Sequence, residues 1–279
     1  MLLPRILTAI VLLAILIPAV LAHSPWPFVG VTLLMLSAGG WEWGRLNGLK
    51  GLSALVAGAV VVVLGGAGAG WLVHGGGLTP LWWAVALLWL TGGAKALQVG
   101  PGLWAGLPRV PRLVAGILAL AVAWLALFSA WRMGLAFLAS VCCLVWMADI
   151  AAYFGGRTLG RRKLAVTISP GKSWEGALTG AAGVLLMAAV WSHLGQGALA
   201  PDLFTLLRQR WGLVAMLAMV ALLVVLSVMG DLIESLVKRA VGVKDSSGLL
   251  PGHGGVLDRI DALLPVLPAA LALASLGGA

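Results

Sequence analysis

Long apolar runs separated by short polar segments dominate the chain. A membrane-spanning helix needs about 20 mostly apolar residues, and the runs recur at about that length. They predict an all-α polytopic membrane protein with about nine spans, near residues 6–22, 27–40, 52–73, 80–98, 112–130, 133–149, 174–195, 211–232 and 262–278. The first run could instead be a secretory signal, because residues 20–22 (VLA) resemble a cleavage site. We favour a retained span, because the charge distribution is then consistent.

Composition supports a membrane protein. Of the 279 residues, 61% are hydrophobic and 10% are charged, whereas soluble domains carry about 25% charged residues. Continuous apolar runs also differ from the alternating strands of a transmembrane barrel. The two cysteines, Cys142 and Cys143, are adjacent in an apolar run, so we interpret them as small buried hydrophobic residues.

Basic residues indicate the orientation. With nine spans, fifteen of the eighteen Lys and Arg residues fall on the side of the N-terminus, and only Arg132, Arg208 and Arg210 fall on the other. The positive-inside rule then places the N-terminus and the polar loops 150–173 and 233–261 in the cytoplasm. Topology therefore accounts for the net charge of +9, and we expect no nucleic-acid partner.

The N-terminal region, 1–130, has abundant glycine inside its spans, which favours close helix packing. Its only acid is Glu42, and the nearby Arg45 suggests a structural ion pair at the membrane interface. We therefore expect residues 1–130 to serve packing and dimerisation, and residues 131–279 to form a catalytic region.

A first polar cluster follows the sixth span, with Asp149, Tyr153 and a basic group that begins at Arg157. The basic group could be topogenic only, or it could attract anionic headgroups or a nucleotide. Farther on, Ser169 and Pro170 are typical of a helix N-cap and first turn, whose free N–H groups attract phosphate. Lys172 would add a charge there, and Glu175 would enter the seventh span.

A second cluster lies at residues 230–261 and holds five of the nine acids. One set shares a single helix face at the end of span eight by its spacing of i, i+3, i+4 and i+7: Asp231, Glu234, Ser235 and Lys238. Asp258 and Asp261 share a face at the start of span nine by the same argument.

A glycine-rich turn lies between these acids. Residues 252–255 (GHGG) could present consecutive N–H groups to an anion, as in a phosphate-binding nest. His253 could act as a general base, but a phosphate monoester is already nucleophilic, so we favour a hydrogen-bonding role. The absence of nearby Cys or His partners in the sequence argues against zinc.

Carboxylates at two helix ends, with cations nearby, suit Mg²⁺ and a polyphosphate. Mg²⁺ prefers oxygen ligands and commonly bridges one or two carboxylates to substrate phosphates. Lys and Arg side chains can then neutralise the charge that develops during nucleotidyl transfer.

These residues resemble a known signature. Ser235, Lys238, Arg239, Lys244 and Asp245, followed by residues 251–261 (PGHGGVLDRID), are similar to the signature of the phosphatidate cytidylyltransferases, or CDP-diacylglycerol synthases. Residues 149–160 (DIAAYFGGRTLG) and 169–176 (SPGKSWEG) also resemble that family. The likeness covers about residues 145–265 and the multi-span character of the chain.

The resemblance implies a reaction in which CTP and phosphatidic acid give CDP-diacylglycerol and pyrophosphate, with Mg²⁺ and possible use of K⁺. It also implies a homodimer in the bacterial inner membrane. The metal candidates are Asp231, Asp258, Asp261 and Glu234. The catalytic candidates are Lys238, Arg239, Lys244, Asp245, His253 and Arg259. The substrate-binding candidates are Tyr153, Arg157, Ser169, Lys172, Glu175, Ser235, Gly254 and Gly255.

In the family, Ser-Gly usually follows the acid that corresponds to Asp149. This sequence departs from that pattern, because it has Ile150 and Ala151 there. Ser173 also occupies a place that is commonly Thr. The departure leaves an inactive homologue as one alternative. An ion or solute transporter is another, although its acids would be spread through the bundle. A CDP-alcohol phosphotransferase would need an Asp-x-x-Asp-Gly-x-x-Ala-Arg core, which this sequence lacks.

Overall fold

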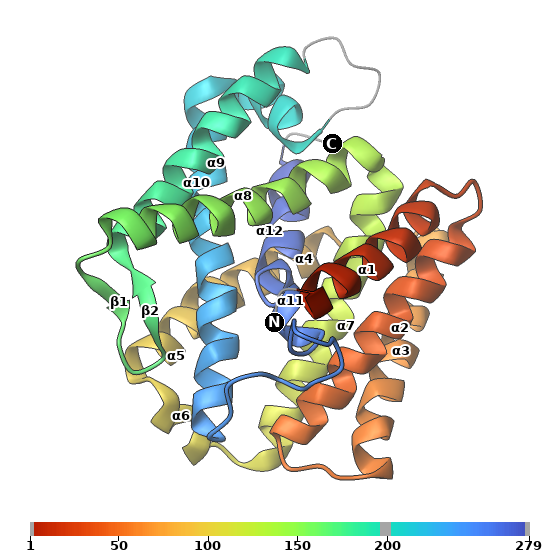
Figure 1. The fold of residues 1–279 in the computed structure, drawn as a ribbon. Helices are drawn as coiled ribbons and strands as arrows, with labels where there is room; N and C mark the ends of the chain where they lie inside the picture. Colours follow the sequence, from red (N-terminus) through yellow and green to blue (C-terminus); the bar gives the residue numbers. More distant parts are fainter. Residues whose placement is uncertain (1–2, 196–201, 277–279) are drawn as a thin grey trace. The chain divides into compact units, whose positions relative to one another are not determined.

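The computed structural model describes residues 3–195 and 202–276, and most of them are helical (Figure 1). The helices of the N-terminal part are α1 (Leu3–Leu21), α2 (Pro25–Leu46), α3 (Leu52–Val73), α4 (Thr79–Leu88), the π-helical turn η1 (Trp89–Gly93), α5 (Ala94–Val99), α6 (Pro101–Gly106) and α7 (Arg109–Met133). The later ones are α8 (Leu135–Leu159), α9 (Trp174–Leu194), α10 (Leu203–Ala240), α11 (Leu257–Ile260) and α12 (Leu263–Ser275).

Each predicted span corresponds to a helix or to a helical run. Among the described residues, five helices are long and apolar enough to cross a membrane: α3, α7, α8, α9 and α10. A shorter apolar helical stretch covers Ile6–Leu21. The chain is therefore a mostly helical protein with several membrane-spanning candidates, and the count of nine spans stays a prediction. The end of the ninth predicted span lies outside the described residues.

The loop between α8 and α9 differs from the prediction, because it holds a two-stranded antiparallel hairpin of β1 (Lys163–Ala165) and β2 (Ser169–Ser173). Ser169 is therefore the first residue of a strand and not a helix N-cap. The N-cap of α9 is Ser173, whose hydroxyl accepts a hydrogen bond from the N–H of Gly176 at 3.1 Å. The prediction of a helix start at Ser169 was wrong, because the chain remains extended for four more residues.

The chain forms two compact units, each assembled from separate stretches. The first unit comprises Met1–Gly76, Gly102–Phe128 and Val237–Ile260, and the second comprises Gly77–Pro101, Ser129–Leu236 and Asp261–Ala279. They are described separately below.

In the first unit, α2 and α3 pack side by side through small residues (Figure 1). A Cβ atom at Gly58 would lie 2.5 Å from the backbone oxygen of Ser37, and one at Gly40 would lie 2.9 Å from the Cα of Gly58. Small residues thus allow close backbone contact between α2 and α3, as is usual between membrane helices. In the same unit, the indole of Trp124 in α7 is buried and donates a hydrogen bond to the Thr32 hydroxyl of α2 at 3.0 Å.

In the second unit, α8 and α9 pack along their length, with the β1–β2 hairpin connecting their ends (Figure 1). Their contact again depends on small residues, because a Cβ atom at Gly180 would lie 2.8 Å from the backbone oxygen of Ala148. The helix α10 is long, and its one non-helical residue is Gly212, with φ of 80°. From Leu213 onward it therefore carries the acidic residues beyond the apolar segment without interruption.

We expect Gly58→Ala to destabilise the first unit, because the new methyl group would meet the rigid backbone of Ser37. Overpacking of this kind typically costs about 1–3 kcal/mol. Gly66→Ala in the same helix is the control, since a Cβ there meets nothing within 4 Å. Thermal unfolding in detergent, followed by circular dichroism, should show a lower midpoint for Gly58→Ala alone. Equal midpoints would contradict this packing.

Candidate active site

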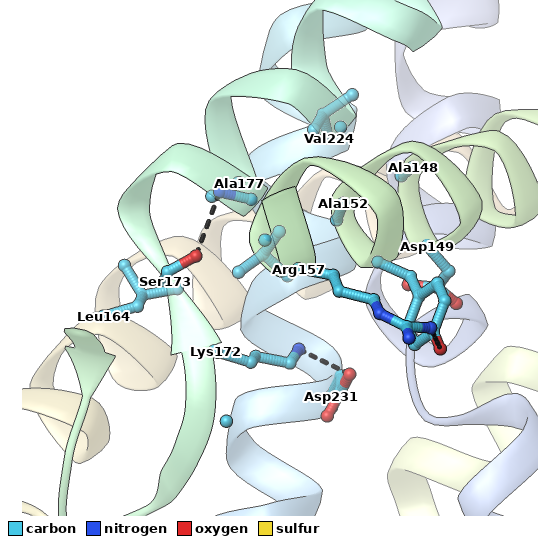
Figure 2. Close-up of a pocket in the computed structure, with 16 residues that line it drawn as sticks. Ala148, Asp149, Ala152, Arg157, Leu164, Lys172, Ser173, Ala177, Val224 and Asp231 are labelled. Atoms are coloured by element: carbon cyan, nitrogen blue, oxygen red, sulfur yellow. Dashed lines mark hydrogen bonds and ion pairs between the residues drawn. The ribbon is translucent and has the colours of Figure 1, made fainter. Parts of the chain in front are cut away.

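A cavity of about 450 Å³ lies in the second unit, between α8, the hairpin, α9 and α10 (Figure 2). Its polar lining consists of Asp149, Tyr153, Arg157, Lys172, Ser173 and Asp231. The remainder is small or apolar and includes Ala148, Ala152, Gly176, Gly180, Val224 and Val228. Its volume lies within the range of about 300–1,000 Å³ that is common for small-ligand pockets.

Lys172 and Asp231 form an ion pair inside this cavity (Figure 2). Strand β2 carries Lys172 beside the buried N-cap residue Ser173, and α10 carries Asp231. Their side chains are 28% and 29% exposed, so both are accessible to a ligand. The Ser235 hydroxyl, one turn along α10, lies 3.4 Å from the other oxygen of Asp231. The cavity therefore contains a cation that can bind a phosphate group and an anion that can bind a metal ion.

Arg157 and Tyr153 extend the polar part of the cavity along α8. The guanidinium of Arg157 donates a hydrogen bond to the Tyr153 hydroxyl at 3.3 Å, and both side chains are exposed. Arg157 thus adds a second cation to the lining.

Glu175 stabilises the hairpin. Its carboxylate accepts hydrogen bonds from the backbone N–H groups of Arg161 and Arg162 at 3.0 and 3.1 Å, and from Nε of Arg162 at 3.1 Å. Neither Glu175 nor Ser169 belongs to the cavity lining. The carboxylate therefore fixes the start of β1 against the first turn of α9.

The predicted helix face at the end of α10 is present, because helical backbone continues through Ala240. On this face, Asp231 is partly exposed, whereas Glu234 and Ser235 are buried, at 6% and 9% exposure. Lys238 follows one turn later and belongs to the first unit. The periodicity alone was sufficient to predict that these residues share one helix face.

In the first unit, Asp258 organises the polar loop. Its Oδ1 pairs with Nζ of Lys238 at 2.5 Å, and its Oδ2 accepts from the N–H of Ser246 at 3.0 Å, the Ser246 hydroxyl at 2.9 Å and the N–H of Gly255 at 2.8 Å. Burial raises the pKa of Asp258, but the hydrogen bonds from Lys238, Gly255 and Ser246 outweigh it and lower the pKa to about 2. Asp258 is therefore a carboxylate at neutral pH.

A second carboxylate contacts the same loop, and the sequence argument missed its role. Glu42 of α2 is fully buried, with 0% exposure. Its oxygens accept from the N–H groups of Val256 at 2.9 Å and Leu257 at 2.8 Å, and from the hydroxyls of Ser246 and Ser247. The predicted ion pair with Arg45 was wrong, because Arg45 lies over the ring of Trp41. The only sequence signal for this role of Glu42 was that it is the single acidic residue of the apolar region 1–130.

The glycine-rich turn does not form the anion nest that we predicted. The N–H of His253 donates to the carbonyl of Leu250, and the N–H of Gly255 donates to Asp258. Gly254 has φ of 82°, and a Cβ on Gly255 would lie 2.0 Å from the Ser246 hydroxyl and 2.4 Å from Glu42. The glycines therefore allow the loop to surround the chain's own carboxylates.

The other candidates of this loop are mostly exposed. Lys244, Asp245 and Arg259 are accessible, and Arg239 is exposed while donating to the carbonyl of Val243 at 3.3 Å. His253 is half-buried, and its Nδ1 has no hydrogen-bond partner among the described residues. The exposed cations can therefore reach a ligand in solution.

Asp261 lies in the second unit, in the turn between α11 and α12, and its Oδ1 accepts from the N–H of Ala262 at 2.7 Å. The prediction that Asp258 and Asp261 share one helix face was wrong, because α11 ends at Ile260.

The departure at Ile150 and Ala151 lies outside the cavity lining. Ile150 is 55% exposed, and Ala151 faces Gly183 of α9, where a Cβ would lie 2.9 Å from the Cβ of Ala151. The methyl group of Ala151 is thus accommodated by a glycine on the neighbouring helix. Ile150 and Ala151 therefore belong to the outer and helix-packing faces of α8 and not to the polar lining.

The acidic residues suit Mg²⁺ by their donor chemistry. Within each unit, no three described His, Cys, Asp or Glu side chains gather as a ready-made metal cage. Mg²⁺ needs only one or two carboxylates when substrate phosphates supply the other oxygens. Asp231 opens on the cavity, and both Asp231 and Asp258 already attract a lysine ammonium group. Such carboxylates fit a hard divalent cation.

Comparison with known proteins agrees with this chemistry. The profile of the Cytidylyltransferase family matches residues 3–276. A phosphatidate cytidylyltransferase of Pseudomonas aeruginosa is 39% identical over 279 residues, which cover 98% of this chain and 97% of the relative. One of Haemophilus influenzae is 36% identical over 295 residues, which cover 96% of each chain. The chain therefore belongs to the cytidylyltransferase family.

Proposed function

We propose that this protein transfers a cytidylyl group from CTP to phosphatidic acid, which gives CDP-diacylglycerol and pyrophosphate for phospholipid synthesis. The observation that carries the proposal is the cavity of the second unit. It combines Lys172, Asp231 and Arg157 with a wall of small and apolar residues. An amphiphilic phosphate fits this lining, because its headgroup meets the charges and its glycerol and acyl carbons meet the apolar wall.

The reaction forms one bond and breaks one. A phosphate oxygen of phosphatidic acid attacks the α-phosphorus of CTP, and the bond from that phosphorus to the β-phosphate oxygen breaks. Pyrophosphate leaves with the electron pair. No general base is needed, because the attacking phosphate is already an anion. The protein therefore contributes mainly alignment and charge stabilisation.

Different cations bind the phosphate groups of the two substrates. Lys172 and Arg157 line the cavity and bind the phosphate of the lipid. Lys238 is held by Asp258, while Arg239, Lys244 and Arg259 remain exposed near the same loop and attract the triphosphate. These groups stabilise the negative charge that builds up on the leaving pyrophosphate.

Asp231 in the second unit and Asp258 in the first are the main candidates to hold Mg²⁺, with Glu234 and Asp261 as further candidates and K⁺ as a possible second cation. The bound metal would withdraw charge from the phosphates of CTP. Lys172 then keeps a role as the cation for the phosphate of the lipid substrate.

The topology follows from the charges. We propose nine spans with a cytoplasmic N-terminus, because fifteen of the eighteen basic residues then face the cytosol, where CTP is present. The protein would reside in the bacterial inner membrane as a homodimer.

The first test is CTP-dependent formation of CDP-diacylglycerol from phosphatidic acid by the purified protein, with and without Mg²⁺. We expect metal-dependent product from the wild type and a loss of about 100-fold or more in Asp231→Asn. Asp231 is a better choice than Asp258, because Asp258→Asn would also disturb the loop hydrogen bonds. A folded wild type without product would point to an inactive homologue or to a transporter.

Lys172→Ala should raise the KM for phosphatidic acid by roughly tenfold to a hundredfold, since a charge-assisted hydrogen bond contributes about 1.5–3 kcal/mol. Lys163→Ala is the control, because Lys163 is an exposed cation of the same hairpin outside the cavity lining. Steady-state kinetics with each substrate varied in turn would check this. An equal effect of both variants, or a change in the KM for CTP alone, would contradict the lipid-binding role.

Reporter fusions test the orientation. A reporter placed after Ala279 should give a periplasmic signal, and one in the hairpin loop at residue 166 should give a cytoplasmic signal. The opposite pattern would overturn the nine-span arrangement.

A further inference from the structure

Glu42 lies far in sequence from the residues that it contacts. It belongs to α2, and its hydrogen-bond partners lie between 204 and 215 positions later in the chain, all within the first unit. Its side chain has no exposure to solvent, so these partners replace water completely. A carboxylate has about four acceptor positions, and four protein donors fill them here.

The four donors lie at both ends of the polar loop. Ser246 and Ser247 precede the glycine-rich turn, whereas the N–H groups of Val256 and Leu257 follow it at the start of α11. One side chain therefore joins the two ends of the loop. Gly255 completes this contact, because any Cβ there would lie 2.4 Å from Oε1 of Glu42.

The same loop residues also hold Asp258. The Ser246 hydroxyl lies 3.3 Å from Glu42 and 2.9 Å from Asp258, and the N–H of Ser246 donates to Asp258. Asp258 in turn pairs with Lys238. A displacement of Ser246 would therefore move the Asp258 carboxylate and the ammonium group of Lys238.

We propose that Glu42 is a positioning residue for the nucleotidyl transfer: from α2, its buried carboxylate fixes residues 246–257 and thereby the placement of Asp258 and Lys238. The catalytic part of this inference rests on the proposed function. Glu42 reaches no substrate in this arrangement, because its oxygens are enclosed by the loop. Its contribution passes through Ser246 and the first residues of α11.

Two further contacts join the N-terminal helices to the same loop. Gly39, three residues before Glu42, lies against Leu257 and Ile260, so a methyl group there would touch both side chains at 3.5 and 3.8 Å. The hydroxyl of Thr8 in α1 donates to the carbonyl of Pro251 at 2.9 Å. The N-terminal helices thus contact the loop at its start, its tip and its end.

The test compares Glu42→Gln with Arg45→Gln. The amide keeps the shape of Glu42 but directs N–H atoms at loop donors, so the loop should loosen. Arg45 lies one turn along α2, is exposed and stacks on Trp41, and it takes no part in the hydrogen bonds to the loop described above, which makes it a matched control. We expect Glu42→Gln to lower kcat at least tenfold with a smaller change in KM, and Arg45→Gln to leave both unchanged.

Amide hydrogen exchange gives a second readout that does not depend on turnover. Peptides that contain Val256 and Leu257 should exchange at least tenfold faster in Glu42→Gln, whereas peptides of α9 should not change. Wild-type exchange in this loop, or wild-type kcat in Glu42→Gln, would overturn the positioning role. An inactive wild type would overturn the proposed function, and the exchange comparison would still decide whether Glu42 holds the loop.

If Glu42→Gln does not fold, Ser247→Ala provides an alternative test of the proposal. It removes one donor to Oε1 and leaves the carboxylate in place. We expect a few-fold loss of kcat and faster exchange in residues 246–257. Unchanged exchange and unchanged kcat would overturn the proposal.

Discussion

The polar loop of the first unit depends on hydrogen bonds to two buried carboxylates, Asp258 and Glu42. A buried carboxylate is strongly unfavourable unless donors or a cation replace its water, and at Asp258 Lys238, Ser246 and Gly255 do so. This requirement explains why the loop is rich in glycine and serine: glycine lets the backbone approach, and serine adds donors. The glycine-rich turn, which we expected to bind an external phosphate, therefore stabilises the protein's own carboxylates.

The features that the sequence predicted correctly depend on residues close to one another in the chain. Helical spacing correctly placed Asp231, Glu234, Ser235 and Lys238 on one face of α10, and apolar runs located the helices. The helix start was misplaced because a Ser-Pro pair also suits an extended strand, and only the pairing of β2 with β1 decides between them. Glu42 was misinterpreted because its partners lie more than 200 positions away, where no local pattern connects them.

The residues that replace the usual Ser-Gly, Ile150 and Ala151, lie outside the cavity lining. Successive residues of a helix point in different directions, so a change beside Asp149 need not alter what Asp149 faces. Ile150 lies on an exposed face, and Ala151 meets Gly183 of α9. The polar side chains that α8 contributes to the cavity are thus at other positions, Asp149, Tyr153 and Arg157.

The distance along the chain between Glu42 and its partners also has a consequence for biogenesis. At a synthesis rate of roughly 5–20 residues per second, the ribosome needs about 10–40 s to proceed from Glu42 to the loop that satisfies its carboxylate. During that interval α2 carries an acid whose final partners do not yet exist, and a carboxylate without hydrogen-bond donors is unfavourable away from water. Water or other donors must therefore satisfy Glu42 until residues 246–257 have been synthesised. Assembly of the first unit can be completed only after that point.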